Sequence, residues 1–379
     1  MLTNHLIFEH YLPFLKRQLN EIYFLHGMRS FMTALAGIFI PIYLLTLNFS
    51  LKEIFLFFII QYISVVIAYF IVTYISTKIG LKHILLIWVP VNLSYLLMFY
   101  FLDKLNIDIY AIALLGGFQL AFYWVPLQCL FGRASEKDHL GKNCSNLEIF
   151  KKIGTTFAPL LGGIIIFFLG FHTLFLILII ISLFSIVPIF QTPEIKPHVT
   201  FEIKKISKIL KKHPKMFFFF FLDQFNFITE SIIWPIFVFL ILKNTISIGF
   251  VGTLLSLGSV IFIFFIGRSS DKSNKKTMIK IGALLTTLIW FSRYYLNSEI
   301  YIYVLTILIG IFSIMKVIPL NALFYQSVKK SDTEEYIISK EIVITVSRIL
   351  ALLIAMFLMD KLDFNFITTG IANLLILFS

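Results

Sequence analysis

Runs of about twenty mostly apolar residues, long enough for a helix to cross a membrane, follow one another along the chain. The chain has 379 residues, of which 59% are hydrophobic and only 14% are charged. A water-soluble globule of this size has too little polar surface to hide so many apolar side chains. Lipid offers the backbone no hydrogen-bond partners. We therefore expect an all-α polytopic membrane protein.

Twelve such runs lie between charged breaks, and the last has only 16 residues before the chain ends. Charged and histidine residues interrupt the first twenty positions, so we expect a short amphipathic segment there and not a cleavable signal. The runs are approximately 22–46, 53–76, 83–102, 109–131, 148–170, 172–191, 216–242, 248–267, 277–297, 300–325, 340–359 and 364–379.

Lysine and arginine are concentrated in alternate connecting segments. The segments that precede odd-numbered runs hold 24 of the 32 cations, whereas the other connections hold only Lys52, Lys104, Lys243 and Lys361. Short cation-rich loops stay in the cytoplasm, so both termini are expected there, in a multi-pass protein of the plasma membrane. The net charge of +12 follows from this topology, and we expect no nucleic-acid partner.

The longest internal polar segment, Thr192 to Pro214, divides the chain. Its isoleucines recur at helical spacing among lysines, which predicts a cytoplasmic linker helix on anionic lipid, with regulatory binding as the alternative. The expected organisation is a six-helix bundle over 1–191, the Lys-rich linker over 192–214 and a second bundle over 215–379.

The two halves of the chain repeat one another at a nearly constant offset. Pro41 matches Pro235 at an offset of 194, and Pro126 matches Pro319 at 193, within similar apolar sequences. Because six spans are an even number, both halves have the same orientation. The repeat predicts two parallel bundles related by a pseudo-twofold axis along the membrane normal.

The loop between the eighth and ninth runs resembles the signature loop of the major facilitator superfamily. It carries Gly267, Asp271, Lys272, Lys275 and Lys276 at the characteristic spacing, with Asn274 replacing a second glycine. The resemblance implies that Asp271 helps to hold an outward-open state, although a tight cationic turn would also explain the lysines. The equivalent loop in the first half keeps only part of the pattern: Lys78, Gly80 and Lys82.

The fifth run contains a second family-like element. Its residues are similar to a glycine- and proline-rich element of proton-coupled antiporters, with alanine at one glycine position: Gly154, Ala158, Pro159, Gly162 and Gly163. The resemblance favours antiport. Small residues also permit ordinary close packing of helices, so that alternative stays open.

Polar side chains inside the spans are the candidates for a solute and proton pathway, because each needs a partner, a cavity or a function. In the family, the first, fourth, seventh and tenth helices line the central cavity. The candidates are His26, Arg29, Gln119, Tyr123, Trp124, Gln128, Asp223, Asn226, Glu230, Lys316, Asn321 and Arg348.

Three expectations concern partners among these charges. Arg29 and Asp223 are equivalent in the repeat and are predicted to pair across the pseudo-twofold axis, either as a gate or as a static bridge. Glu230 is the first choice for proton coupling and Asp223 the second, with exchange against a cationic substrate as a competing role. Arg293 is expected to snorkel toward the outer surface, and Glu341 is expected to interact only with residues one turn away.

The leading function is secondary transport of a small solute by alternating access, through proton-coupled export. Symport or uniport uptake of a small anionic or zwitterionic metabolite is the alternative, and a membrane enzyme or a non-transporting receptor is a minor one. The chain has no ATP-binding loop, and its two cysteines and scattered histidines have no metal-ligand spacing. We expect a monomer that is not an enzyme and uses no metal or cofactor.

Overall fold

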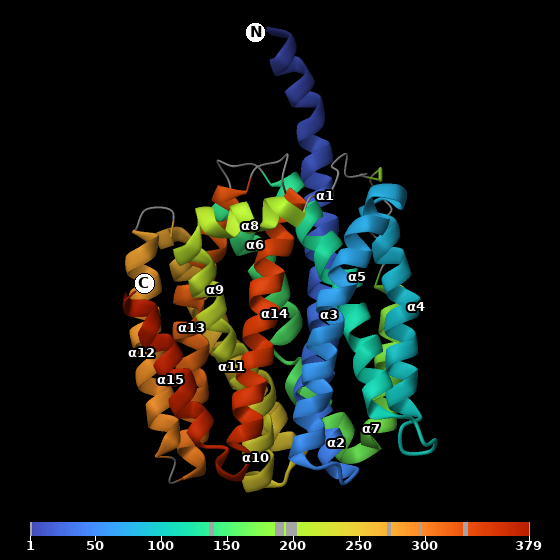
Figure 1. The fold of residues 1–379 in the computed structure, drawn as a ribbon, viewed down its shortest axis with the longest axis vertical. Helices are drawn as coiled ribbons and strands as arrows, with labels where there is room; N and C mark the ends of the chain where they lie inside the picture. Colours follow the sequence, from blue (N-terminus) through green and yellow to red (C-terminus); the bar gives the residue numbers. More distant parts are fainter. Residues whose placement is uncertain are drawn as a thin grey trace.

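The computed structural model describes residues 2–135, 140–185, 193–194, 203–270, 274–295, 298–328 and 333–378. Within these ranges the regular secondary structure is helical, as expected for a chain that buries its backbone polar groups in lipid. The long helices stand side by side, and most run the length of the body (Figure 1).

In the first half of the chain, the described residues form eight helical elements. They are α1 (Leu2–Ala36), η1 (Gly37–Phe39), α2 (Ile40–Thr46), α3 (Leu51–Ile79), α4 (Leu81–Tyr100), α5 (Ile109–Ala134), α6 (Leu140–Thr155) and α7 (Ala158–Phe184). Local sequence explains several boundaries: Ser50 and Glu53 form a capping box at the start of α3. Gly170 interrupts α7 with a φ of 79°, close to the predicted border between the fifth and sixth runs.

The second half begins with the short helix α8 and repeats the arrangement. Its elements are α8 (Ile203–Lys212), α9 (Pro214–Ile228), the π-helical η4 (Thr229–Ile233), α10 (Trp234–Leu242), α11 (Thr245–Ser270), α12 (Lys275–Tyr294), α13 (Glu299–Ser327), α14 (Thr333–Phe357), η6 (Met359–Lys361) and α15 (Phe364–Phe378). Each of the twelve predicted runs overlaps one or more of the helices in the two halves.

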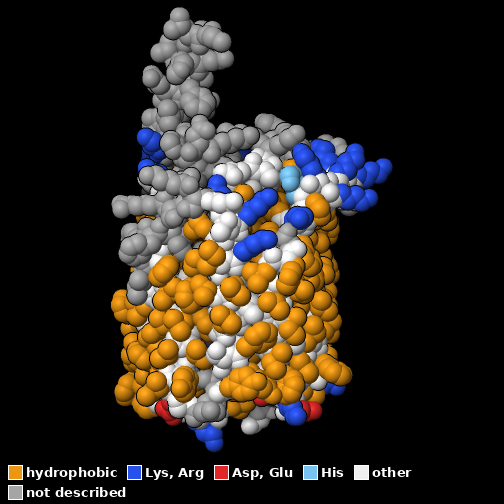
Figure 2. Space-filling model, turned by 90° about the vertical axis from the view of Figure 1, so that its left-hand side faces the viewer, with side chains coloured by type: hydrophobic (Ala, Val, Ile, Leu, Met, Phe, Trp, Pro, Cys, Tyr) orange, Lys and Arg blue, Asp and Glu red, His pale blue; other side chains and the backbone are white. Residues whose placement is uncertain are grey.

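Seven helical segments in the described ranges are long and apolar enough to cross a membrane by length and composition. One of them, Lys142–Phe184, has 43 residues, which is enough for two crossings. Figure 2 shows a broad hydrophobic surface on the face turned to the viewer, with lysine and arginine gathered mainly at one end. We call this end the Lys-rich end; its cytoplasmic location remains a prediction.

Helix α8 lies at the Lys-rich end and packs on α14 (Figure 1). Its apolar residues Ile206 and Ile209 are buried, and Lys205 lies 3.6 Å from Glu335 of α14. The predicted linker helix is therefore present, but its apolar side packs on protein, where the sequence pattern predicted contact with lipid.

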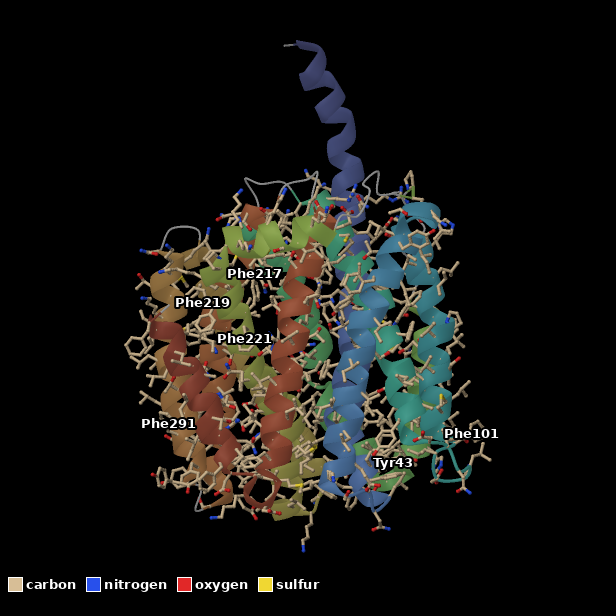
Figure 3. All side chains as sticks on the ribbon, viewed as in Figure 1. Tyr43, Phe101, Phe217, Phe219, Phe221 and Phe291 are labelled. Carbon is tan, nitrogen blue, oxygen red and sulfur yellow. The ribbon has the colours of Figure 1, made fainter. Side chains whose placement is uncertain are left out.

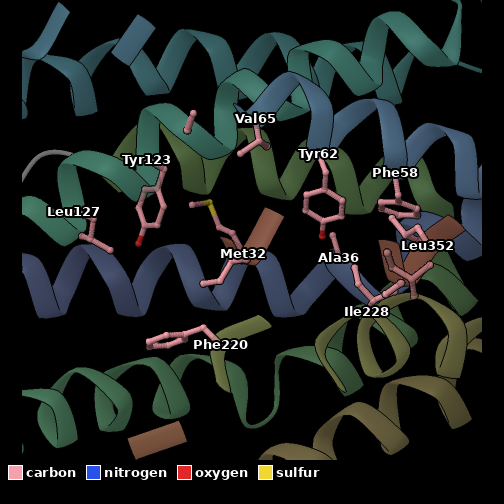
Figure 4. Packing of buried hydrophobic residues seen from close by; sticks show 14 of the residues in the cluster. Met32, Ala36, Phe58, Tyr62, Val65, Tyr123, Leu127, Phe220, Ile228 and Leu352 are labelled. Carbon is pink, nitrogen blue, oxygen red and sulfur yellow. The ribbon is translucent and has the colours of Figure 1, made fainter. Parts of the chain in front are cut away.

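Helices α1–α7 form the N-terminal half and α9–α15 the C-terminal half, and one hydrophobic cluster joins them. Figure 4 shows Ala36 of α1 near Tyr62 of α3 and Ile228 of α9. The two halves therefore share a core instead of packing as separate units.

Aromatic side chains fill much of each half (Figure 3). Phe217 and Phe219 are buried on α9. Tyr43 of α2 packs against three phenylalanine rings at centroid distances of 4.7–6.3 Å. Large rings bury much apolar area with few rotatable bonds, so they stiffen the bundles around the polar groups described next.

Candidate functional site

Arg29 lies half-buried inside the N-terminal half, among neutral groups. Its Nη1 donates to Thr33 Oγ1 at 2.9 Å, and its Nη2 donates to Gln119 Oε1 at 2.9 Å. The guanidinium carbon is 5.5 Å from the ring centres of both Trp88 and Tyr123. Helices α1, α4 and α5 thus hold one cation by hydrogen bonds and aromatic faces.

Two more predicted residues join this cluster. His26 Nδ1 lies 3.0 Å from the Tyr123 hydroxyl, and the His26 ring meets the Trp124 ring edge-on. Trp88 also belongs here, because its Nε1 donates to Gln119 Oε1 at 3.3 Å. Sequence reasoning missed Trp88, since α4 corresponds to a supporting helix and tryptophan there reads as ordinary core.

A second polar cluster lies inside the C-terminal half. Lys316 Nζ is 3.0 Å from Asp223 Oδ1 and donates to Asn373 Oδ1 at 2.7 Å. Asn226 Nδ2 also donates to Asn373 Oδ1, and Trp290 Nε1 donates to Asn226 Oδ1. The network includes Asn373 and Trp290, which were not among the predicted residues. A polar asparagine inside the last apolar run could have identified Asn373 as a candidate.

The predicted pair between Arg29 and Asp223 is wrong for this conformation. The internal repeat supplies the reason, because Tyr123 and Lys316 are also equivalent, at an offset of 193. Arg29 meets Tyr123 in the N-terminal half just as Asp223 meets Lys316 in the C-terminal half. Each charge therefore contacts a residue of its own half, on equivalent helices. It does not pair with the equivalent charge across the pseudo-twofold axis.

The expectation that Arg293 snorkels is also wrong. The side chain is fully buried, and its Nη1 contacts Glu230 Oε1. Its guanidinium carbon lies 3.8 Å from the centre of the Trp234 ring and 4.6 Å from that of Trp290. The carboxylate and the two rings replace the hydration that a snorkelling side chain would seek.

Glu230 lies in the π-helical turn η4 and borders a small cavity. The other lining residues include Trp234, Thr306 and Ile38, so the cavity lies between the two halves. Its volume of about 20 Å³ is enough for about one water molecule. Within the part of the chain that the structure describes, Glu230 Oε2 has no hydrogen-bond partner.

Glu341 of α14 binds residues of the other half, not only its own helix as expected. Its carboxylate accepts from the Tyr69 hydroxyl and from Gln128 Nε2, both at 2.8 Å. Lys340 contacts Gln128 Oε1 and lies 3.6 Å from Glu341 Oε1. The equivalent residue Glu148 does pair locally, with Lys151 at 3.1 Å.

One further bridge lies toward the Lys-rich end. Arg133 Nε, near the end of α5, donates to Glu334 Oε1 of α14 at 3.0 Å. Together with the Glu341 contacts, this bridge joins α14 to α3 and α5. The two halves are therefore closed against each other on this side by charged hydrogen bonds.

Arg348 lies on α14 close to both halves. Its Nε donates to Gln224 Oε1 at 2.9 Å, and its guanidinium carbon lies 4.0 Å from the centre of the Phe227 ring and 5.3 Å from that of Tyr62. Asn321 is half-buried on α13 and joins none of these clusters.

The signature-like loops are described only in part. Asp271 and Lys272 lie outside the described residues, and Gly267 falls within α11. Lys275 and Lys276 begin α12, where Asn274 Oδ1 accepts the backbone N–H of Lys276 at 3.1 Å. The asparagine that replaces the second glycine therefore caps the helix.

The first-half copy of the loop ends α3 at Gly80, whose φ of 98° favours glycine. Lys78 lies over the Tyr74 ring, whereas Lys82 is buried and lies 3.0 Å from Glu21 of α1. The linker residue Glu194 accepts the backbone N–H of Lys82 at 3.0 Å. A linker carboxylate therefore caps the start of α4 in a loop that lacks the family's aspartate.

The glycine-rich element of the fifth run lies where the two halves meet. A Cβ on Gly163 would overlap the carbonyl oxygen of Thr245 in α11, and one on Gly249 would overlap that of Pro159. Gly162 and Gly154 approach backbone atoms of α1 in the same way, and Ala158 is buried. These contacts support the packing interpretation, and the antiporter interpretation stays a prediction.

Comparisons with known proteins agree with this architecture. A family model described as Major Facilitator Superfamily matches residues 22–223 and 219–379. A solved structure of the human organic anion transporter MFSD10 (TETRAN) superposes with a TM-score of 0.74 at 12% identity, over 96% of this chain and 99% of that one. No curated protein sequence matches the chain.

Proposed function

The chain belongs to the Major Facilitator Superfamily, and on that premise we propose that it exports a small solute across the plasma membrane in exchange for protons. Secondary transport by alternating access is the function that the family and the fold support. Proton-coupled antiport is our more specific proposal, and Glu230 carries it.

Glu230 is placed where a proton could be exchanged between the two halves. One of its oxygens contacts Arg293, the other has no partner among the described residues, and the side chain borders the cavity that reaches Ile38. Within a membrane, a carboxylate keeps its charge only while a cation or water compensates it. Any movement that separates Glu230 from Arg293 therefore favours proton uptake.

Protonation would in turn alter the contacts between the halves. A neutral Glu230 leaves the Arg293 charge to the rings of Trp234 and Trp290 and to the Thr306 hydroxyl. Trp234 lines the cavity between the halves, so the change reaches their interface. In this proposal, the proton and the solute alternate because each favours a different arrangement of that interface.

Opening toward the Lys-rich end requires a second set of contacts to break. The bridges from Glu334 and Glu341 of α14 to α5 and α3 hold that side closed. Since these are charged groups at the cytoplasmic side of our predicted topology, water that enters on opening can solvate them. Closure and opening can then be close in free energy.

The test is proton movement in proteoliposomes that contain the full chain and a pH-sensitive dye. Outward gradients of candidate metabolites are imposed, and the change in lumenal pH is recorded for wild type, Glu230→Gln and the control Glu299→Gln. Glu299 is an exposed carboxylate at the start of α13. We expect solute-driven proton movement to be lost only in Glu230→Gln; its persistence there would refute the role of Glu230.

Uptake of an anionic or zwitterionic solute by symport or uniport is the second candidate. It is supported by the excess of cations over carboxylates in the membrane-spanning helices. The structural neighbour named as an organic anion transporter is consistent with that class of solute. Flux that does not respond to an imposed pH gradient would favour uniport. Acidification of the compartment that the solute enters would indicate symport, and acidification of the compartment that it leaves would indicate antiport.

A further inference from the structure

Glu53 is bonded to Ser50 in the capping box of α3, and the other buried and half-buried carboxylates of the described membrane-spanning helices each have a cation beside them. The pairs are Glu21 with Lys82, Glu148 with Lys151, Asp223 with Lys316, Glu230 with Arg293, Glu334 with Arg133, Glu335 with Lys205 and Glu341 with Lys340. Arg29 and Arg348 are bonded only to neutral groups in the same part of the chain. Arg29 and Arg348 thus have no counter-ion among the described residues.

Of Arg29 and Arg348, Arg29 has more polar and aromatic groups around it. It donates to Thr33 and Gln119, which uses two of the five N–H donors of a guanidinium. Trp88 and Tyr123 present their rings to it from different helices. The Thr33 side chain, which accepts one of these bonds, is exposed.

The internal repeat shows that this lone charge is specific to the N-terminal half. The equivalent of Arg29 is Asp223, and the C-terminal half neutralises it with Lys316. No carboxylate among the described residues neutralises Arg29, although an unpaired charge in a membrane is costly. A half-buried cation whose partners are all neutral is suited to reversible binding of an anion.

We propose that Arg29 binds the anionic group of the transported solute, a small organic anion with a carboxylate, phosphate or sulfonate. The planar guanidinium fork matches these groups, and its spare N–H donors would supply the bonds. The rings of Trp88, Tyr123 and Trp124 would pack against the organic part. This assignment rests on the proposed transport function and deepens it by naming the substrate class.

Arg348 adds a second positive charge near the same region. Its guanidinium carbon lies 5.3 Å from the centre of the Tyr62 ring. Both charges favour a negative solute over a neutral one of the same shape.

The experiment measures binding at equilibrium, with the full chain purified in detergent. Thermal unfolding is followed in benzoate, phenyl phosphate and benzenesulfonate, with sodium chloride at equal ionic strength and neutral benzamide as references. We expect at least one of the anions to raise the unfolding temperature of wild type by several degrees, and benzamide to have no such effect. Arg29→Gln should lose that shift without loss of basal stability, because it removes an uncompensated charge.

Two further variants keep the result interpretable. Arg29→Lys retains the charge but loses the fork, and should raise the anion concentration for half of the shift by about tenfold. Lys361→Gln, at an exposed cation outside the spans, should keep the full shift. An equal shift in Arg29→Gln or Arg29→Lys, an equal shift with benzamide, or no shift from any of the three anions would overturn the proposal.

Failure of this proposal is distinguishable from failure of proton-coupled export. The binding measurement uses no membrane and no gradient, so lost coupling at Glu230 leaves the anion shift intact. Conversely, absence of the anion shift together with intact proton movement would leave antiport standing and remove only the assignment of Arg29.

Discussion

Replacement of Arg293 by methionine tests the most unexpected feature of the fold. The side chain is fully buried, contacts Glu230 and lies between the rings of Trp234 and Trp290. Methionine has a similar length and packs well against aromatic rings, so the change removes the charge while leaving much of the volume filled. It leaves Glu230 buried without a cation.

The expected cost follows from these contacts. Removal of one partner of a buried ion pair costs about 3–5 kcal/mol, and each cation–π contact contributes about 0.5–2 kcal/mol. Because methionine keeps part of the ring contacts, we expect Arg293→Met to lower the free energy of unfolding by about 4 kcal/mol. Adding Glu230→Gln removes the stranded carboxylate and should recover about 2 kcal/mol of that loss.

The assay is unfolding of the purified chain by sodium dodecyl sulfate in a mild non-ionic detergent, followed by far-ultraviolet circular dichroism. Wild type, both single variants and the double variant complete the cycle, and Lys361→Met serves as an exposed control. An exposed or snorkelling arginine would contribute only about 0–1 kcal/mol. A loss below about 1 kcal/mol in Arg293→Met would therefore refute the buried pair.

Two further predictions concern the halves and their contact. Exchange of the charges of Asp223 and Lys316 should restore proteoliposome flux that either single reversal abolishes, because the two side chains face each other at 3.0 Å. Exchange between Arg29 and Asp223 should not restore it, and recovery there would reinstate the pair across the pseudo-twofold axis. Gly249→Ala should lower stability by about 1–3 kcal/mol in thermal unfolding, since its Cβ overlaps a backbone oxygen. Gly37→Ala, whose nearest neighbour would be 3.5 Å away, should be tolerated, and equal stability of the two variants would contradict the close contact between α7 and α11.

Much of the fold was predictable from the sequence because a membrane leaves the backbone few choices. Each apolar run must satisfy its own hydrogen bonds, so it becomes a helix whatever its neighbours are. The offsets of 193 and 194 revealed the repeat, and the structure places the equivalent pairs Arg29–Tyr123 and Asp223–Lys316 in matching positions. Even the break near Gly170 falls where the pattern changed.

The candidate site was predictable in its residue types and less so in its partners. Helical spacing correctly brought His26 and Arg29 to one face, and both meet Tyr123. Spacing along one helix does not tell which helix that face meets. For this reason Glu230 and Arg293 were both noted as unusual charges, yet their contact could not be inferred.

The sequence by itself determined the helices, the repeat and the positions of the unusual charges, since these depend on local periodicity and on the exclusion of polar groups from lipid. Only the tertiary structure decided which charges are neutralised. That outcome depends on how each helix is rotated and how closely it approaches its neighbours, as at Gly163 and Thr245. The rotation buries Arg293 against Glu230 and leaves Arg29 with neutral partners. Dense packing between the helices decides which face each helix presents to its neighbours, and no local sequence pattern contains that information.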